Sequence, residues 1–290
     1  MKVLVIGPQG QLGSDLFRVN ETLQKPFHLI PVEKKILNLF EIGSISKILA
    51  QWQFDTLVNC SAYNRVDLVE EDSSGAFRIN AHAVREMAAA CHAQGARLIH
   101  VSTDYVFDGK NSQAYRESDL PFPINLYGAS KLLGEAFASL ENEDSLILRT
   151  ASLFGISESS SKHGNFVESI LKAAKEKGIV RVVNDVTMSP TGTYSLARIL
   201  LDFIEKKPEK GIYHAVNSGQ ATWFEFAKAI LDRTGVKSEM IPVTSKEYPT
   251  QAKRPTLSVL DNSKTAQIVG SIPHWKEALD HYLHAKGHLV

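Results

Sequence analysis

The chain has 290 residues, 43% of them hydrophobic, so it can bury a substantial core in one large domain or in a main domain with a smaller lobe. Its 32 basic residues balance its 32 acidic residues, which removes the electrostatic basis for a nucleic-acid or anionic-membrane surface. Two cysteines, Cys60 and Cys91, are too few for a disulfide scaffold. The short apolar run before Gly7 does not predict a signal peptide, and no stretch approaches the ~18 apolar residues that span a bilayer. We therefore expect a cytoplasmic protein with no nucleic-acid or membrane partner, and the sequence leaves a homodimer open.

Short β-branched runs alternate with longer amphipathic stretches, which is the pattern of βαβ units around a parallel sheet. The runs that predict strands are, in chain order, Val3–Ile6, His28–Val32, Thr56–Asn59, Arg97–Ser102 and Leu146–Leu148, with Val180–Val183 as a further candidate. The stretches that predict helices are Ile42–Leu49, Asn80–His92, about Tyr127–Ser139 and Trp223–Thr234.

The first predicted strand leads into Gly7-Pro8-Gln9-Gly10-Gln11-Leu12-Gly13, a G-x-x-G-x-x-G motif that opens a helix. Glycines here allow a tight turn, let the backbone approach a pyrophosphate, and leave the helix N-terminus facing its charge. A glycine triplet alone is a weak signal, but its place at the first strand–helix junction favours a dinucleotide site. The motif and the alternation together predict a Rossmann-type, doubly wound parallel α/β sheet.

Charged residues close the second predicted strand, roughly 20 residues further on. Glu33 can accept hydrogen bonds from the adenosine ribose hydroxyls, which favours NAD. Lys34 and Lys35 can instead hold a 2′-phosphate, which favours NADP. The two signals conflict, so we expect either NADPH or NADH as the cofactor, and a solvated turn explains each charge equally well.

A second constellation combines the end of the fourth predicted strand with the start of the third predicted helix. Tyr127 and Lys131 form a Y-x-x-x-K motif, whose i, i+4 spacing puts both side chains on one helix face. A neighbouring ammonium lowers the tyrosine pKa from its usual value of ~10, so the pair can pass a proton to a carbonyl oxygen. Thr103 follows the strand and can hydrogen-bond the same oxygen.

The regular rhythm of the elements loosens after Gly155. A polar Ser/Glu cluster at residues 157–161 predicts a loop. We expect a dinucleotide-binding Rossmann domain over residues 1–155. Residues 156–290 are predicted to form mainly a smaller C-terminal α/β substrate-binding lobe, interleaved with the first domain.

The combined motifs resemble the extended short-chain dehydrogenase/reductases, and more closely the dTDP-4-dehydrorhamnose reductase family. The resemblance extends through Val58–Tyr63, Leu126–Gly128, Ser189–Thr191, Gly211–His214 and Ala252–Pro255. It implies NAD(P)H-dependent reduction of the C4 ketone of a dTDP-4-keto-6-deoxy-L-sugar, from dTDP-4-dehydrorhamnose to dTDP-L-rhamnose. A dTDP-linked ketosugar is then the expected partner, and cell-surface polysaccharide biosynthesis the expected context.

The resemblance also assigns roles to individual residues. It implies Thr103, Tyr127 and Lys131 as catalytic residues, and Asp104, Tyr105 and Arg254 as substrate contacts. Together with the charges at the second strand, the expected cofactor-binding residues are Gly7, Gly10, Gln11, Leu12, Gly13, Glu33, Lys34, Asn38, Leu39, Cys60, Ser61, Ala62, Tyr63, Tyr127 and Lys131. Asn38 replaces the aspartate usual in the family, and Leu153 replaces a tryptophan that often lies at the substrate, which leaves the exact sugar open.

Other functions share parts of this pattern. A 4,6-dehydratase needs a glutamate after the Thr-Asp pair, and Tyr105 stands there instead. A related ketosugar reductase or an epimerase remains open. The non-catalytic regulatory subunit of methionine adenosyltransferase resembles the same group, but the intact Thr103, Tyr127 and Lys131 disfavour that role.

A metal site is not expected from the sequence. Three histidines near the C-terminus could line one helix face, but no carboxylate or cysteine cluster accompanies them. A solvated terminal helix is the favoured interpretation of His281, His284 and His288.

Overall fold

The computed structural model of the chain describes residues 1–157 and 164–289, so most of the loop predicted at 157–161 lies outside the described residues. In this part of the chain, a six-stranded parallel sheet forms the centre, in the order β10-β5-β4-β3-β1-β2. Its strands are β1 (Lys2–Ile6), β2 (His28–Val32), β3 (Thr56–Asn59), β4 (Arg97–Thr103), β5 (Ser145–Thr150) and β10 (Gly211–His214). The first five strands confirm the runs predicted from the sequence.

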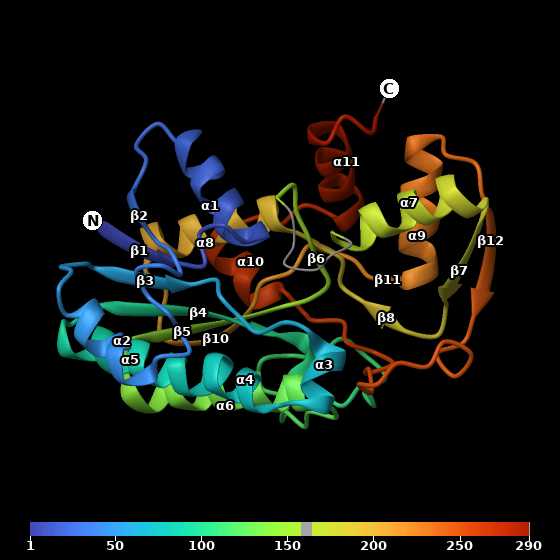
Figure 1. Cartoon of the computed structure of the whole chain (residues 1–290). Coiled ribbons are helices and arrows are strands. Elements are labelled where there is room, and N and C mark those ends of the chain that lie inside the picture. The colour runs from blue at the N-terminus through green and yellow to red at the C-terminus, as the bar shows by residue number, and fades with distance from the viewer. Residues whose placement is uncertain (158–163, 290) are drawn as a thin grey trace.

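Helices cover both faces of the sheet, which confirms the doubly wound Rossmann-type fold (Figure 1). Alternate residues of β1 pack against the helices on opposite faces of the sheet, because successive side chains of a strand point to opposite faces. Val3 and Val5 pack with one set of helices, and Leu4 and Ile6 pack with the other. The first set comprises α1 (Gln11–Glu21), α8 (Thr193–Lys206) and α10 (Ser263–Val269); the second comprises α2 (Ile42–Leu49), α5 (Ala83–Ala93) and α6 (Leu126–Glu141).

Two elements from the second half of the chain belong to this first core. Strand β10 pairs with β5 and extends the sheet, and α8 packs against α1. The sequence did not predict β10, because a four-residue run far from the other strands carries little periodic signal. The two halves of the chain are therefore interleaved in space, with residues 193–214 in the first core.

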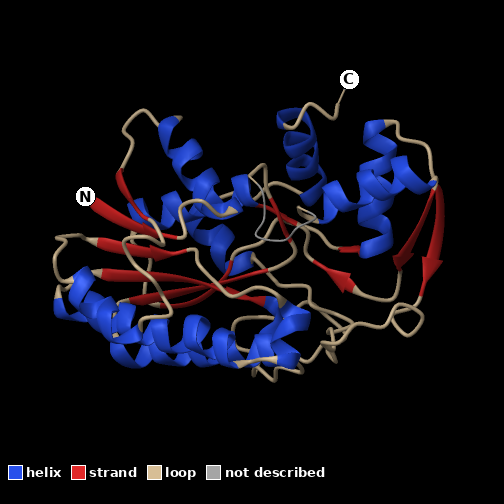
Figure 2. Cartoon of the chain, in the orientation of Figure 1, coloured by secondary structure: helices blue, strands red, loops and turns tan. Residues whose placement is uncertain are grey.

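A smaller second lobe lies beside the sheet and has its own apolar core around Phe154, Phe226 and Leu279 (Figure 2). The strand predicted at 180–183 is found here, where β7 pairs in parallel with β12. The lobe contains α7 (Phe166–Lys177), α9 (Trp223–Thr234), α11 (Trp275–Ala285), β7 (Ile179–Val183) and β12 (Glu239–Val243), and the short pairs β6 (Leu153–Phe154) with β9 (Thr191–Gly192) and β8 (Thr187–Met188) with β11 (Ala221–Thr222).

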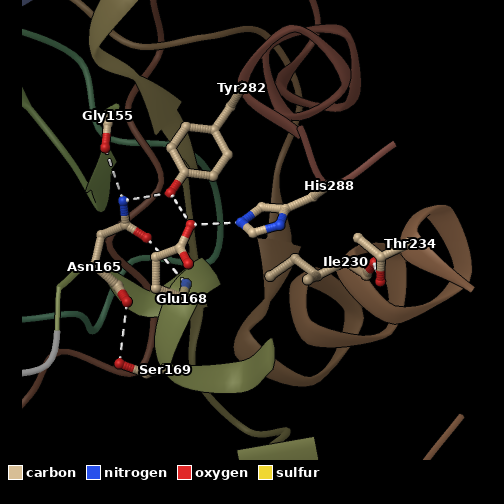
Figure 3. Close-up of polar contacts among 8 residues, drawn as sticks. All are labelled: Gly155, Asn165, Glu168, Ser169, Ile230, Thr234, Tyr282 and His288. Atoms are coloured by element: carbon tan, nitrogen blue, oxygen red, sulfur yellow. Dashed lines mark hydrogen bonds and ion pairs between the residues drawn. The ribbon is translucent and has the colours of Figure 1, made fainter. Parts of the chain in front are cut away.

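A polar cluster fastens α11 to the start of α7 (Figure 3). Tyr282 Oη donates to Glu168 Oε1 at 2.6 Å, and His288 Nε2 lies 2.9 Å from the same oxygen. Asn165 Nδ2 donates to Tyr282 Oη at 3.1 Å and to Gly155 O at 3.0 Å. These bonds tie the end of the chain to the segment that follows β6.

The terminal histidines have separate partners rather than a common centre. His288 pairs with Glu168, whereas the ring of His281 packs at a tilt of 34° against Tyr194 with centroids 4.0 Å apart. Within residues 1–157 and 164–289, no group of three or more His, Cys, Asp or Glu side chains could hold a metal ion. The helices in those same ranges are too short or too polar to cross a membrane.

Candidate functional site

A cavity of about 680 Å³ opens at the C-terminal edge of the sheet, between the neighbouring strands β1 and β3. The chain passes from β1 to β2 on one side of this point and from β3 to β4 on the other. Open α/β sheets bind ligands at such a switch point. Most of the predicted site residues line it. They are Gly7, Gly10, Gln11, Leu12, Lys34, Cys60, Ser61, Ala62, Thr103, Asp104, Tyr105, Tyr127 and Lys131.

The glycine motif forms a turn that only glycine permits at two positions. Gly7 has a φ of +77°, in the left-handed region, and a Cβ there would lie 3.1 Å from the backbone nitrogen of Ser61. Gly13 packs so closely on this turn that a Cβ would overlap the carbonyl oxygen of Gly7. Gly10 caps α1 with no side chain in the way, so the first N–H groups of the helix remain available beside the cavity. This cradle fits the pyrophosphate of a dinucleotide.

Several residues predicted at the adenosine end lie outside the cavity lining. Glu33 pairs with Lys35 at 2.9 Å, while Lys34 lines the cavity. Asn38 braces its own loop, since its Nδ2 donates to Glu41 Oε1 at 2.9 Å. Leu39 packs against the core beneath α2. Of the charges at the second strand, Lys34 is therefore the one placed to meet a ligand.

Asn80 shapes the loop after β3, a role that no local sequence pattern indicated. It lies in a π-helical turn (η1, Arg78–His82), a distortion that is frequent at functional sites. Its Oδ1 accepts from Tyr63 N at 2.8 Å, and its Nδ2 donates to Tyr63 O at 3.0 Å. Nδ2 also donates to Ser130 Oγ at 3.0 Å. Asn80 thus ties the cofactor-side loop at Tyr63 to α6, although Tyr63 itself does not line the cavity.

Helix α6 places Tyr127 beside the end of β4. The helix begins with an N-cap at Asn125, whose Oδ1 accepts from Gly128 N at 2.7 Å. A Cβ at Gly128 would overlap the carbonyl oxygen of Tyr105, so the helix packs directly on η2 (Asp104–Val106). The rings of Tyr105 and Tyr127 meet edge to face with centroids 6.1 Å apart. Thr103, Tyr127 and Lys131 consequently share one cavity.

The pKa of Tyr127 is opposite to the sequence expectation. Burial and the carboxylate of Asp104 raise the tyrosine pKa above its usual value, and a hydrogen bond with Thr103 opposes the rise. Lys131 does not reverse this, because its ammonium donates to the carbonyl oxygen of Val101 at 2.6 Å. Tyr127 therefore keeps its proton at neutral pH.

Burial also shifts the pKa values of Lys131 and Asp104, two further ionisable groups of the site. It lowers the pKa of Lys131 to about 8, although the charge of Glu135 acts in the opposite direction. It raises the pKa of the Asp104 carboxyl to about 6. Such displaced pKa values in a cavity are typical of functional sites.

A buried ion pair between Arg149 and Glu135 packs against the elements that carry Thr103 and Lys131. Arg149 Nη2 donates to Glu135 Oε2 at 2.6 Å, and both side chains are almost fully buried. Ser102 Oγ donates to Glu135 Oε1 at 2.5 Å, and the guanidinium lies over the ring of Phe107 at 5.0 Å. The pair joins α6, β4 and β5 directly behind Thr103 and Lys131.

The placement of Arg254 and Trp223 relative to the cavity differs from the sequence expectation. Arg254 does not line the cavity; it is held by Asp67 of α3 (Val66–Glu71) and hydrogen-bonds the hydroxyl side of Tyr105. Leu153 of β6 lines the cavity, and so does Trp223 at the start of α9, so the second lobe contributes both residues to the lining. The Trp223 ring packs on Phe166 with centroids 4.6 Å apart. Sequence reasoning missed Trp223 because nothing local to helix α9 indicates what its first residue faces.

The whole chain matches one family. The family model described as "RmlD substrate binding domain" matches residues 1–287. The chain is 40% identical over 285 residues to the spore coat polysaccharide biosynthesis protein SpsK of Bacillus subtilis (strain 168), covering 97% of this chain and 96% of that protein. It is 33% identical over 296 residues to a dTDP-4-dehydrorhamnose reductase of Burkholderia thailandensis, covering 96% and 97% of the two chains.

Solved structures agree with the sequence relatives. The crystal structure of dTDP-4-dehydrorhamnose reductase from Bacillus anthracis in complex with NADP matches with a TM-score of 0.90 and 32% identity, over 98% of this chain and 99% of that one. The chain therefore belongs to the RmlD substrate-binding family, the family of the dTDP-4-dehydrorhamnose reductases.

Proposed function

We propose that the chain is an NADPH- or NADH-dependent oxidoreductase that reduces the C4 ketone of dTDP-4-dehydrorhamnose to give dTDP-L-rhamnose. The observation that carries this proposal is the meeting of Thr103, Tyr127 and Lys131 with the Gly7 turn in one cavity. The activity named for the relatives from Burkholderia thailandensis and Bacillus anthracis supports the substrate, and the NADP bound in the latter supports the cofactor.

The three catalytic residues divide the proton chemistry. A bound nicotinamide would supply the hydride to C4, so the protein must supply a proton to the ketone oxygen. Tyr127 Oη donates this proton, while the Thr103 hydroxyl hydrogen-bonds the same oxygen as negative charge develops on it. Lys131 lines the same cavity, and its ammonium would bind the nicotinamide ribose.

The electrostatics suit the direction of reduction. Because burial and Asp104 raise the pKa of Tyr127, the phenol is protonated before the reaction and can act as an acid. With a pKa of about 8, Lys131 is mostly protonated at neutral pH but close enough to titration to exchange its proton.

The other end of the cavity would hold the sugar nucleotide. Asp104 and Tyr105 would contact the sugar, and the indole of Trp223 offers an aromatic face to the sugar or the base. Arg254 would hold the hydroxyl of Tyr105 in place by a hydrogen bond. Leu153 leaves this side apolar, which is the feature that favours a related dTDP-ketosugar as the alternative substrate.

The test is oxidation of NADPH, and separately of NADH, by the purified protein. The sugars are dTDP-4-dehydrorhamnose and, in parallel, dTDP-4-keto-6-deoxy-D-glucose, with a control that lacks sugar. Sugar-dependent oxidation with the first sugar and formation of dTDP-L-rhamnose are expected. Preference for the second sugar would reassign the substrate within the family. Cofactor binding without oxidation of either sugar would contradict the enzymatic proposal and favour a regulatory role.

A further inference from the structure

A buried chain of hydrogen bonds connects the cofactor side of the cavity to Lys131. It starts at Ser61, which lines the cavity, and passes through Asn59 of β3 and His100 of β4. Asn59 Nδ2 lies 3.1 Å from His100 Nδ1, and His100 Nε2 lies 3.4 Å from Lys131 Nζ. Asn59, His100 and Lys131 are each at most 1% exposed, so water does not screen these contacts.

The directions of these bonds fix the protonation of His100. Ser61 directs both its backbone N–H and its hydroxyl to Asn59 Oδ1, at 3.1 and 2.6 Å. An amide oxygen can only accept, so the opposite end of Asn59 must be its NH₂ group, which can only donate. The His100 nitrogen that faces it, Nδ1, must therefore accept. A neutral imidazole whose Nδ1 accepts carries its hydrogen on Nε2.

That hydrogen points at the catalytic lysine. An ammonium has no lone pair, so the Nε2–H of His100 and the ammonium of Lys131 present two donors to each other. The neutral amine of Lys131 has a lone pair and can accept from Nε2–H. His100 thus stabilises the amine form and disfavours the ammonium form, while Val101 O still accepts from Nζ at 2.6 Å.

We propose that His100 is a positioning residue for Lys131: fixed by Asn59 as the Nε2–H tautomer, it makes the lysine proton readily exchangeable. This proposal rests on the proposed function, because an exchangeable proton at Lys131 allows Tyr127 to be reprotonated after each turnover. His100 itself does not line the cavity.

The other charges near Lys131 do not remove this effect. On its own helix, Glu135 favours the ammonium, but Arg149 of β5 donates to both oxygens of that carboxylate. Asp104 acts chiefly on Tyr127, one turn before Lys131 on α6. From β3 and β4, the polar groups facing His100 and Lys131 are Asn59 and Val101 O, which carry no net charge.

The experiment follows the protein by NMR without any ketosugar, with ¹⁵N in histidine and ¹³Cε in lysine. Wild-type His100 should show the Nε2–H tautomer, and its Nε2 resonance should shift with the same midpoint as the titration of Lys131, near pH 8. In His100→Phe, which keeps the volume but has no N–H, the Lys131 midpoint should rise by roughly one pH unit. The exposed His92 supplies the matched control, and His92→Phe should leave the midpoint unchanged.

The outcomes separate cleanly. An Nδ1–H tautomer in the wild-type protein, or no common midpoint for the two resonances, would overturn the proposal even if His100→Phe failed to fold. An unchanged Lys131 titration in folded His100→Phe would overturn it as well. Neither readout depends on reduction of a sugar, so a negative result in the oxidation assay would refute the proposed function and leave this test intact.

Discussion

Arg254 forms a bidentate ion pair with Asp67 through both terminal nitrogens of its guanidinium: Nη1 donates to Oδ1 at 3.1 Å and Nη2 donates to Oδ2 at 2.8 Å. The two residues are 187 positions apart in the chain, so the pair joins α3 to the segment after β12. The same guanidinium hydrogen-bonds Tyr105, which does line the cavity. Arg254 therefore orients a ring that lines the cavity, and Asp67 orients Arg254.

Removing the charge of Asp67 should weaken sugar-nucleotide binding. In Asp67→Asn the charged acceptor is lost from an ion pair whose Asp67 side chain is 42% exposed, which costs about 0.5–1 kcal/mol, so KM for the sugar nucleotide should rise roughly two- to fivefold. The Kd of NADPH, measured by fluorescence titration, should not change. Asp232→Asn, at an exposed position of α9, is the control. An unchanged KM in Asp67→Asn would show that Tyr105 needs no support from Arg254.

Asp104 should make stability depend on pH. Burial raises its pKa to about 6, above the unfolded value, so the protonated carboxyl is the form that the fold favours. Its stabilising contribution is complete below pH ~4 and is lost as pH rises through about 6. Asp104→Asn should therefore raise the free energy of unfolding at pH 8 by about 3 kcal/mol and change it little at pH 4. Urea unfolding at both pH values measures this, and a variant equally stable or less stable than wild type at pH 8 would contradict it.

The Glu135–Arg149 pair should show strong coupling. Arg149→Met leaves the carboxylate of Glu135 buried and unpaired, which should lower the free energy of unfolding by about 3–5 kcal/mol. The double variant Glu135→Leu with Arg149→Met removes both charges and should recover most of that loss. Urea unfolding of the single and double variants gives the coupling energy. If the losses of stability in Arg149→Met and in Glu135→Leu add up to the loss in the double variant, the two side chains are not energetically coupled, which would contradict the prediction.

Replacing Trp223 should weaken binding of the sugar nucleotide and leave the affinity for NADPH unchanged. Trp223→Ala removes the aromatic wall that the second lobe contributes to the cavity, so KM for the sugar nucleotide should rise at least tenfold, as expected for about 1.5 kcal/mol of lost aromatic contact. Tyr248→Ala, at an exposed ring outside the cavity, is the control. An equal loss of NADPH affinity in Trp223→Ala would mean that the indole supports the whole cavity.

The sequence predicted what depends on local pattern. The short β-branched run of β1, the glycine turn at Gly7, and the i, i+4 pair of Tyr127 and Lys131 are all set by neighbouring residues, and the structure contains each of them. Features that depend on distant contacts escaped prediction. Asn80 acts through a π-helical turn, and β10 joins the sheet from residue 211 onward.

The electrostatics could not be predicted from spacing either. Lys131 stands one turn after Tyr127, which favoured a lowered tyrosine pKa, but burial and Asp104 reverse the direction. Arg254 was expected at the substrate, but a carboxylate 187 positions away holds it behind Tyr105. Burial and long-range partners decide these properties, and neither is visible in a local window of sequence.

The roles of NADPH as hydride donor and Tyr127 as proton donor are tested together by following the deuterium of labelled NADPH and the turnover rate. NADPH carrying deuterium at the transferred position is incubated with dTDP-4-dehydrorhamnose and either the wild-type protein or Tyr127→Phe. We expect deuterium at C4 of dTDP-L-rhamnose with the wild type, and a loss of kcat of roughly 10²-fold or more in Tyr127→Phe with NADPH still bound. Turnover close to the wild-type rate in Tyr127→Phe, or a product without deuterium at C4, would contradict these roles.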